Sequence, residues 1–279
     1  MKEVTVAVVQ MAPKLGAVEE NMARMGQIVE EICLHQDTDL IVFPELATTG
    51  YECGVHFTDL AQSVPGHTTN YLAERASRFS THILFGMAEE GKPDSVIYNS
   101  AVLVGPEGEV ITKYAKVHLK GEERLAFRPG YRFVVADTAF GRLGILIGWD
   151  LAFPEATRSL VLQEADLVCV CADWEKPHRD EWRTYNRARA FENSVYIASA
   201  NRVGEEYTYS FLGDSMITGP RGESCAMIEP VKNEQGEEHE VEKYAVAKLD
   251  LDEVRRFRDD FQLLQARQPR SYRELVKMY

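Results

Sequence analysis

The sequence predicts an α/β fold in which two mixed β-sheets pack face to face and helices cover their outer sides, a four-layer α-β-β-α sandwich. The first observation is that short apolar segments alternate with longer ones that carry apolar residues at helical spacing. The second is that both halves of the chain follow one order, strand–helix–strand and then hairpins. No linker rich in Pro, Gly or Ser divides the 279 residues, so we expect one domain over residues 1–279.

The first half is expected to alternate strands with two helices. A β-branched run begins the chain, and Met22, Met25 and Ile32 give the segment after it a helical apolar face. A turn with glycine and proline at 105–108 separates two further strands. The predicted strands are 4–10, 40–43, 82–87, 98–104 and 110–114, and the predicted helices are 18–35 and 70–80.

The second half is expected to repeat this arrangement. Residues 167–172 are all apolar, which is typical of a strand that is buried on both faces. Pro154 and Glu155 favour the first turn of a helix. The polar, acidic segment 233–242 is expected to form a solvated hairpin tip. The predicted strands are 144–147, 167–172, 195–200, 215–218, 223–227 and 244–249, and the predicted helices are 154–163, 181–193 and 251–258.

The composition restricts the kinds of partner. The net charge is −13 and the isoelectric point is about 5.1, so this chain would attract neither nucleic acid nor an anionic membrane. No segment reaches the roughly 18 apolar residues of a membrane helix. The five cysteines lack the spacing of a disulfide framework, so we expect reduced thiols in a cytoplasmic protein. Cys169 and Cys171 alternate within an apolar strand and are expected to be small core residues rather than metal ligands.

Three separated segments carry the polar residues on which a functional prediction can be based. They are LIVFPELATTGY at 40–51, KYAKVHLKGEER at 113–124 with FRPG at 127–130, and GILIGWDLAFPE at 144–155. In this order, with supporting matches at 189–193, 200–204 and 213–215, they resemble the nitrilase, or carbon–nitrogen hydrolase, superfamily. The resemblance implies the same sandwich fold and the hydrolysis of non-peptide carbon–nitrogen bonds.

Glu45 and Lys116 are the first two candidate catalytic residues. A carboxylate directly after a strand faces the crevice in which α/β folds bind ligands, and burial would raise its pKa toward neutrality. The resemblance implies that Glu45 is the general base and that Lys116 stabilises the oxyanion of the tetrahedral intermediate. It also implies a second glutamate shortly after the lysine, which is Glu123, with the adjacent Glu122 as the alternative. His118 is expected to be a structural hydrogen-bonding residue.

Gly148 occupies the position at which the resemblance implies a nucleophilic cysteine. A cysteine there would lie beside Glu45 and would attack the amide or nitrile carbon as a thiolate. Glycine keeps the turn and the backbone N–H, but loss of a nucleophile costs several powers of ten in rate. Three interpretations are open: a laboratory knock-out, a natural pseudoenzyme that still binds a ligand, or an enzyme that uses water or another cysteine.

The substrate is expected to be a small, neutral primary amide. Four aromatic residues are candidates for the walls of a neutral pocket: Tyr51, Trp149, Phe153 and Trp174. No arginine closely follows position 148, which disfavours carboxylated substrates such as N-carbamoyl amino acids. The pattern at 149–158 is similar to that of carbamoylputrescine amidohydrolases, so N-carbamoyl amines are an alternative substrate class, and nitriles are another.

The resemblance also implies a homodimer or a larger homo-oligomer. The C-terminal tail, about 259–279, is expected to take part in the contact between subunits. No phosphate loop, flavin motif or dinucleotide fingerprint is present in the sequence, so no cofactor is expected. The histidines lack the spacing of metal ligands, and no metal is expected either.

Overall fold

The first of two large sheets contains both the beginning of the chain and its last strand. The structure is a computed structural model that describes residues 3–92, 96–232, 236 and 238–277. In this sheet β1, β2 and β3 run parallel to one another, and the three outer strands are antiparallel to their neighbours. The order is β16-β1-β2-β3-β4-β5, formed by Lys243–Asp250, Glu3–Gln10, Leu40–Val42, His82–Glu90, Ile97–Val104 and Val110–Ala115.

The second large sheet has the same plan. Its strands β7, β8 and β9 run parallel, and β6, β12 and β13 are antiparallel to their neighbours. The order is β13-β12-β9-β8-β7-β6, formed by Ser224–Met227, Met216–Thr218, Tyr196–Asn201, Leu167–Ala172, Arg142–Ile147 and Val134–Asp137. The repeated order predicted from the two halves of the sequence is therefore confirmed.

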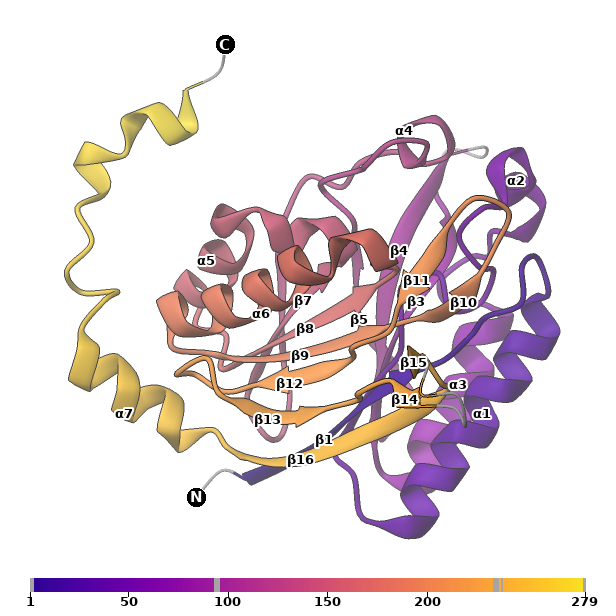
Figure 1. Cartoon of the computed structure of the whole chain (residues 1–279), viewed down its shortest axis with the longest axis horizontal. Coiled ribbons are helices and arrows are strands. Elements are labelled where there is room, and N and C mark those ends of the chain that lie inside the picture. The colour runs from indigo at the N-terminus through magenta and orange to yellow at the C-terminus, as the bar shows by residue number, and fades with distance from the viewer. Residues whose placement is uncertain (1–2, 93–95, 233–235, 237, 278–279) are drawn as a thin grey trace.

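Helices cover the outer face of each sheet. α1 (Val18–His35) and α3 (His67–Phe79) bury their apolar faces against the first sheet. α5 (Pro154–Leu162) and α6 (Arg179–Asn193) do the same on the second sheet. Figure 1 shows the resulting order of layers, helix–sheet–sheet–helix, which is the predicted sandwich. Within the described ranges, no helix is long and apolar enough to cross a bilayer.

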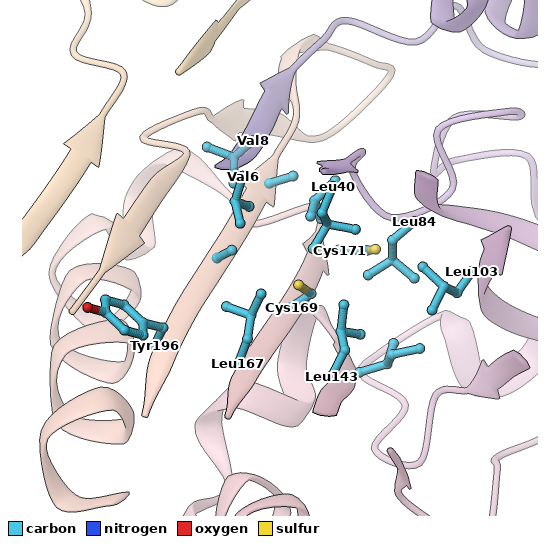
Figure 2. Close-up of a cluster of buried hydrophobic side chains, with 14 of the residues drawn as sticks. Val6, Val8, Leu40, Leu84, Leu103, Leu143, Leu167, Cys169, Cys171 and Tyr196 are labelled. Carbon is cyan, nitrogen blue, oxygen red and sulfur yellow. The ribbon is translucent and has the colours of Figure 1, made fainter. Parts of the chain in front are cut away.

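The main core lies between the two sheets. Figure 2 shows Val6, Leu40 and Leu84 of the first sheet facing Leu167 and other side chains of the second. These side chains are fully buried, so the inner faces of both sheets are apolar at alternate positions. Cys169 and Cys171 point into this core with no exposed surface, which confirms that they are small core residues.

Short helical turns and small hairpins lie in the loops, and two of these turns carry candidate catalytic positions. The turns are η1 (Gly54–His56), α2 (Phe57–Leu60), α4 (Glu123–Ala126), η2 (Gly148–Ala152) and η3 (Lys176–His178). The hairpins pair β10 (Val203–Glu205) with β11 (Ser210–Leu212), and β14 (Val231–Lys232) with β15 (Glu238–His239).

The C-terminal segment extends away from the sandwich. After β16 the chain forms α7 (Asp252–Phe261) and then the short turns η4 (Pro269–Ser271) and η5 (Arg273–Val276). In Figure 1 this yellow segment forms an arm beside α5 and α6. Leu275 and Val276 near its end are largely exposed.

Several boundaries differ from the predicted ones for local reasons. α3 begins at His67 rather than 70, because its first turn is polar and Thr69 caps the Gly66 N–H at 2.7 Å. α6 begins at Arg179 rather than 181, and α7 continues to Phe261. The strands β6, β10 and β11 were not predicted, because they are short and have little apolar periodicity. Of the predicted hairpin tip at 233–242, positions 233–235 and 237 lie outside the described residues.

Candidate active site

Glu45 lies at the carboxyl end of β2, as predicted, and only 1% of its surface is exposed. Pro44 ends the strand, and the chain then turns sharply so that Leu46 adopts a positive φ of 42°. The neighbouring strand β3 carries Gly86 at this point, and a Cβ there would lie 2.6 Å from the Glu45 Cα. Gly86 therefore allows the turn that carries Glu45 to lie directly against the sheet.

Lys116 brings two carboxylates together in a buried cluster. Its Nζ lies 2.7 Å from Glu45 Oε1 and 2.7 Å from Glu123 Oε1, and the side chain is 2% exposed. Asn99 donates to Glu45 Oε1 at 2.6 Å, and Tyr51 donates its hydroxyl to Glu123 Oε1 at 2.8 Å. We call Glu45, Lys116 and Glu123 the charged trio. With all three groups ionised, its net charge is −1.

The structure distinguishes between the two adjacent glutamates. Glu123 is 5% exposed and also accepts a hydrogen bond from the Lys120 backbone N–H at 3.1 Å. Glu122 is exposed to solvent. Of the two candidates, Glu123 is therefore the one that contacts Lys116.

Burial and neighbouring charges shift the proton affinities of the trio. Burial raises the pKa of Glu45 to about 7, and the Glu123 carboxylate contributes to this rise although Lys116 opposes it. Burial acts to lower the pKa of Lys116, but Glu123 and Glu45 outweigh it and hold that pKa above its usual value. The site therefore combines a permanent cation with a carboxyl group that exchanges protons near neutral pH.

Gly148 lies where the trio meets the second sheet. It follows β7 directly and has φ of +43°, a left-handed conformation that glycine adopts without strain. A Cβ built on it would lie 3.3 Å from Lys116 Nζ and 3.3 Å from Glu45 Cδ, and it would press against Glu45 Oε2. Any side chain at position 148 would therefore contact both Glu45 and Lys116.

Asp150 holds the turn around Gly148 in place. Its buried carboxylate accepts from the Tyr114 hydroxyl at 2.7 Å, from His118 Nδ1 at 2.8 Å and from the His118 backbone N–H at 2.9 Å. The Ile147 N–H donates to it at 3.2 Å. These contacts connect the turn to the segment that carries Lys116, and they give His118 the structural part expected for it.

A small cavity of about 20 Å³ lies over these groups, which is enough for about one water molecule. Its lining includes Tyr51, Trp149 and Trp174, as predicted for the walls. Phe153 differs from the prediction, because the structure does not bring it to this cavity. Its ring stacks on His118 with centroids 3.7 Å apart and meets Trp149 edge-on, so it supports the wall from behind.

Sequence reasoning missed five polar residues at or beside this site: Asn99, Lys120, Asp150, Asp173 and Glu175. Asn99 lies within a predicted strand and Asp150 within a turn, and nothing in the sequence around them indicated a part in the site. Asp173, which also lines the cavity, directly follows the apolar strand β8. The rule that identified Glu45, a carboxylate at the carboxyl end of a strand, applies equally to Asp173.

Comparisons with known proteins identify the family of this chain. The carbon–nitrogen hydrolase family model matches residues 5–259. A Schizosaccharomyces pombe protein named "probable nitrilase" is 38% identical over 275 residues, covering 97% of this chain and 98% of that protein. A Pseudomonas sp. protein named "(R)-stereoselective amidase" is 33% identical over 265 residues, covering 94% of this chain and 90% of that protein.

The solved structures agree on the fold. A carbon–nitrogen hydrolase from Helicobacter pylori G27 superposes with a TM-score of 0.86 at 23% identity, and the match covers 99% of both chains. Since the family model spans most of the sequence and relatives above 30% identity span nearly all of it, this chain belongs to the carbon–nitrogen hydrolase family.

Proposed function

We propose that this chain has the site of an amidase, which binds a small primary amide, but lacks the attacking sulfur. The observation that supports this most directly is the surroundings of position 148. A Cβ there lies 3.3 Å from Lys116 Nζ and against the Glu45 carboxylate. A cysteine at that point would have a base and a fixed cation within reach, as nucleophilic amide hydrolysis requires.

With a cysteine at position 148, the steps follow from the charges. Glu45 accepts the thiol proton, and the thiolate attacks the amide carbon while negative charge develops on the amide oxygen. The buried Lys116 ammonium stabilises that charge more strongly than it would in water. Glu45 then returns the proton to the nitrogen, so that ammonia leaves and a thioester remains. Water that transfers a proton to Glu45 hydrolyses the thioester to the acid.

With Gly148 this covalent route is absent, and we expect turnover to be lost or reduced by several powers of ten. The alternative is a natural pseudoenzyme that binds a small ligand or a partner without turnover. The coding sequence separates the two origins of Gly148. A cysteine codon at this position would identify a laboratory variant, and a glycine codon favours the pseudoenzyme.

Other cysteines are poor replacements for the missing nucleophile. Cys171 is the one closest along the sheet, but it is fully buried in the core between the sheets, and burial raises the pKa of its thiol well above the usual value. Burial also raises the pKa of Cys53 to about 11, and its thiol donates to the Thr49 carbonyl at 3.2 Å. Water activated by Glu45 is the better-supported route to any slow turnover.

The preferred substrate class is a primary amide, with N-carbamoyl amines and nitriles as alternatives. The cavity has room only for a compact group, which suits the end of a small amide. Two relatives are named a probable nitrilase and an amidase, so the test includes both nitriles and amides. All three classes release ammonia on complete hydrolysis to the acid or amine, so one assay compares them.

The test is to measure ammonia release by the unaltered chain and by Gly148→Cys with a panel of amides, carbamoyl compounds and nitriles. Gly148→Ala is the matched control, because it adds the Cβ without the sulfur. Turnover by Gly148→Cys alone supports the proposal, and the preferred compound gives the substrate class. If no variant turns over any compound, the binding-only alternative is favoured. Ammonia release by the unaltered chain as fast as that by Gly148→Cys would mean that position 148 is not where the nucleophile belongs.

We also propose that the chain forms a homodimer or larger homo-oligomer through the arm at 259–279. Its exposed apolar side chains, Phe261, Leu263, Tyr272, Leu275 and Val276, support this, as does the cavity of about 550 Å³ between the arm, α5 and α6. Light scattering of the full chain and of one ending at Asp260 tests it. The same number of subunits per particle in both would contradict it. The unpaired cysteines support a reducing, cytoplasmic location.

A further inference from the structure

Asp173 is a buried carboxyl group without a hydrogen-bond partner in the described part of the chain. Only 9% of its surface is exposed, and neither carboxyl oxygen accepts or donates a hydrogen bond there. Buried polar groups in folded proteins nearly always have partners, and leaving one unpaired is costly. Asp173 also lines the cavity over the charged trio, so a ligand in that cavity is the natural partner for it.

The fold fixes Asp173 next to the reacting position. Strands β7 and β8 are parallel neighbours with Ile147 opposite Cys171, so Gly148 and Asp173 leave the sheet at the same edge. Asn201 then holds the backbone after Asp173, because it accepts from the Trp174 N–H at 2.7 Å. The backbone that carries Asp173 therefore lies in a fixed place, as a residue that recognises a substrate requires.

The charges around Asp173 determine which chemistry it recognises. Burial raises the pKa of Asp173 well above its usual value, and among the neighbouring groups Glu45 and Glu206 raise it while Arg202 and Lys116 lower it. Because burial disfavours the carboxylate, Asp173 needs either a proton or another cation close to it. An ammonium group on a ligand supplies that cation.

The remaining charged groups of the cavity favour the same ligand. Besides the charged trio and Asp173, the lining contains Lys120 and Glu175, which form an ion pair at 3.1 Å. With Asp173 protonated, the three other carboxylates and the two ammonium groups of the lining have a net charge of −1, which becomes −2 when Asp173 gives up its proton. An anionic ligand would be repelled, and a cationic one attracted.

We propose that Asp173 binds an ammonium group on the acyl side of the substrate, so that the substrate class is an amino-substituted primary amide rather than a neutral one. This inference rests on the proposed amide function and specifies its substrate. When the ammonium group binds, the proton on Asp173 passes to solvent and an ion pair forms inside the cavity.

Glycinamide and propionamide are a matched pair of probes for this proposal. The two amides have nearly the same size, but glycinamide carries an α-amino group with a pKa near 8, so it is mostly a cation at pH 7. Calorimetric titration of the unaltered Gly148 chain, which lacks the nucleophile, measures binding of both. We expect glycinamide to bind roughly 10- to 100-fold more tightly, the range of a buried hydrogen bond to a charged group.

Two variants distinguish a direct contact between Asp173 and the ammonium group of the ligand from the overall electrostatic field of the cavity. Asp173→Asn removes the charge but keeps the shape, and we expect it to abolish the preference for glycinamide while propionamide still binds. Glu175→Gln removes another negative charge from the lining, and we expect the preference to change less than about threefold, because the Glu175 charge is already paired with Lys120 at 3.1 Å. Retained propionamide binding also shows that Asp173→Asn leaves the site folded.

The pH dependence gives a second readout. Binding of glycinamide releases the proton of Asp173, so its affinity should rise with pH until the ligand itself deprotonates near pH 8. Glu45, whose pKa is about 7, titrates in the same cavity with either ligand, so the rise should be steeper for glycinamide than for propionamide. Asp173→Asn should remove this difference between the two amides. The measured heat of glycinamide binding should depend on the ionisation enthalpy of the buffer.

Each outcome distinguishes this inference from the proposed function. Equal affinities for both amides in the unaltered chain would overturn the part assigned to Asp173 and leave the amide function standing. Ethylammonium, which has the cation but no amide, completes the set. If it binds through Asp173 while neither amide does, the cation site stands and the amide function fails. If none of the three probes binds, both are overturned.

Discussion

Replacing Lys116 by methionine, a side chain of similar length without the charge, is the most informative test of the charged trio. The replacement removes two hydrogen bonds of 2.7 Å and leaves Glu45 and Glu123 facing each other in a buried space. Removal of one partner of a buried ion pair costs about 3–5 kcal/mol of stability, because the remaining charge is uncompensated. We expect Lys116→Met to lose that amount at pH 7.

The expected loss depends on pH in a direction that can be worked out. Without Lys116, the two carboxyl groups of the variant must take up protons to remain buried, so their pKa values rise above those of the unfolded chain. A raised carboxyl pKa stabilises the folded state at low pH, and this contribution is lost as pH rises through it. Burial already raises the pKa of Glu45 to about 7 in the unaltered chain, so the variant gains only one further protonated carboxyl group. At about 1.4 kcal/mol per pH unit for that one group, the loss at pH 5 should be smaller than at pH 7 by up to about 2.7 kcal/mol.

The assay is urea unfolding followed by tryptophan fluorescence at pH 5 and pH 7, with equal protein concentrations. Lys248→Met is the matched control, because Lys248 pairs with Glu3 at 2.6 Å on the surface, where its side chain is 62% exposed. Such pairs contribute about 0–1 kcal/mol, so the control should change little at either pH. If Lys116→Met resembled the control, or lost equal stability at both pH values, the description of the trio as a buried, mutually dependent charge cluster would be refuted.

Three further predictions concern the frame of the site. Leu143→Ala in the core between the sheets should lower the free energy of unfolding by about 2–5 kcal/mol in denaturant titrations, whereas Leu125→Ala at an exposed position should change it by less than about 0.5 kcal/mol. Asp150→Asn should cost about 1–3 kcal/mol, because an amide cannot satisfy four donors, and unchanged thermal unfolding would contradict this. Gly148→Cys should lower the free energy of unfolding by about 1–2 kcal/mol, since it forces a side chain into a left-handed conformation. Its urea midpoint should therefore be lower than that of the unaltered chain. An unchanged midpoint for Gly148→Cys would mean that the turn relaxes around the new side chain.

The fold was predictable because its strongest signals are local. The fully apolar strand at 167–172 and the amphipathic helix at 18–35 appear in the structure with their predicted boundaries. Boundaries were missed where a helix begins with a polar turn, as at His67, because such a turn shows no apolar periodicity. The short strand β6 forms a hairpin with β7, and a strand of four residues is too short to show a clear apolar alternation in the sequence.

The candidate site was predictable only in part, for a related reason. Glu45, Lys116 and Glu123 were identified from motifs, and the structure brings them within hydrogen-bond distance of one another. Asn99 was missed because a polar residue within a strand has no distinguishing neighbours, although it donates directly to Glu45. Phe153 was assigned to the wall because aromatic residues near a site are good candidates, but its ring stacks on His118 and does not line the cavity.

The charged trio and the glycine at position 148 have opposite effects on the stability of the fold. Buried charges like those of Lys116 and its two carboxylates are poor stabilisers, since apolar replacements of the same volume are often neutral or better. The proposed amide function gives them another purpose, which is to stabilise charge that develops on a bound ligand. Gly148, in contrast, relieves backbone strain at a point where a side chain would press on the Glu45 carboxylate. Asp150 rather than residue 148 anchors the turn, so Lys116 and Glu45 keep their places without a side chain at position 148. We therefore expect binding measurements on the unaltered chain to report on ligand binding alone, without the covalent chemistry proposed for a cysteine at this position.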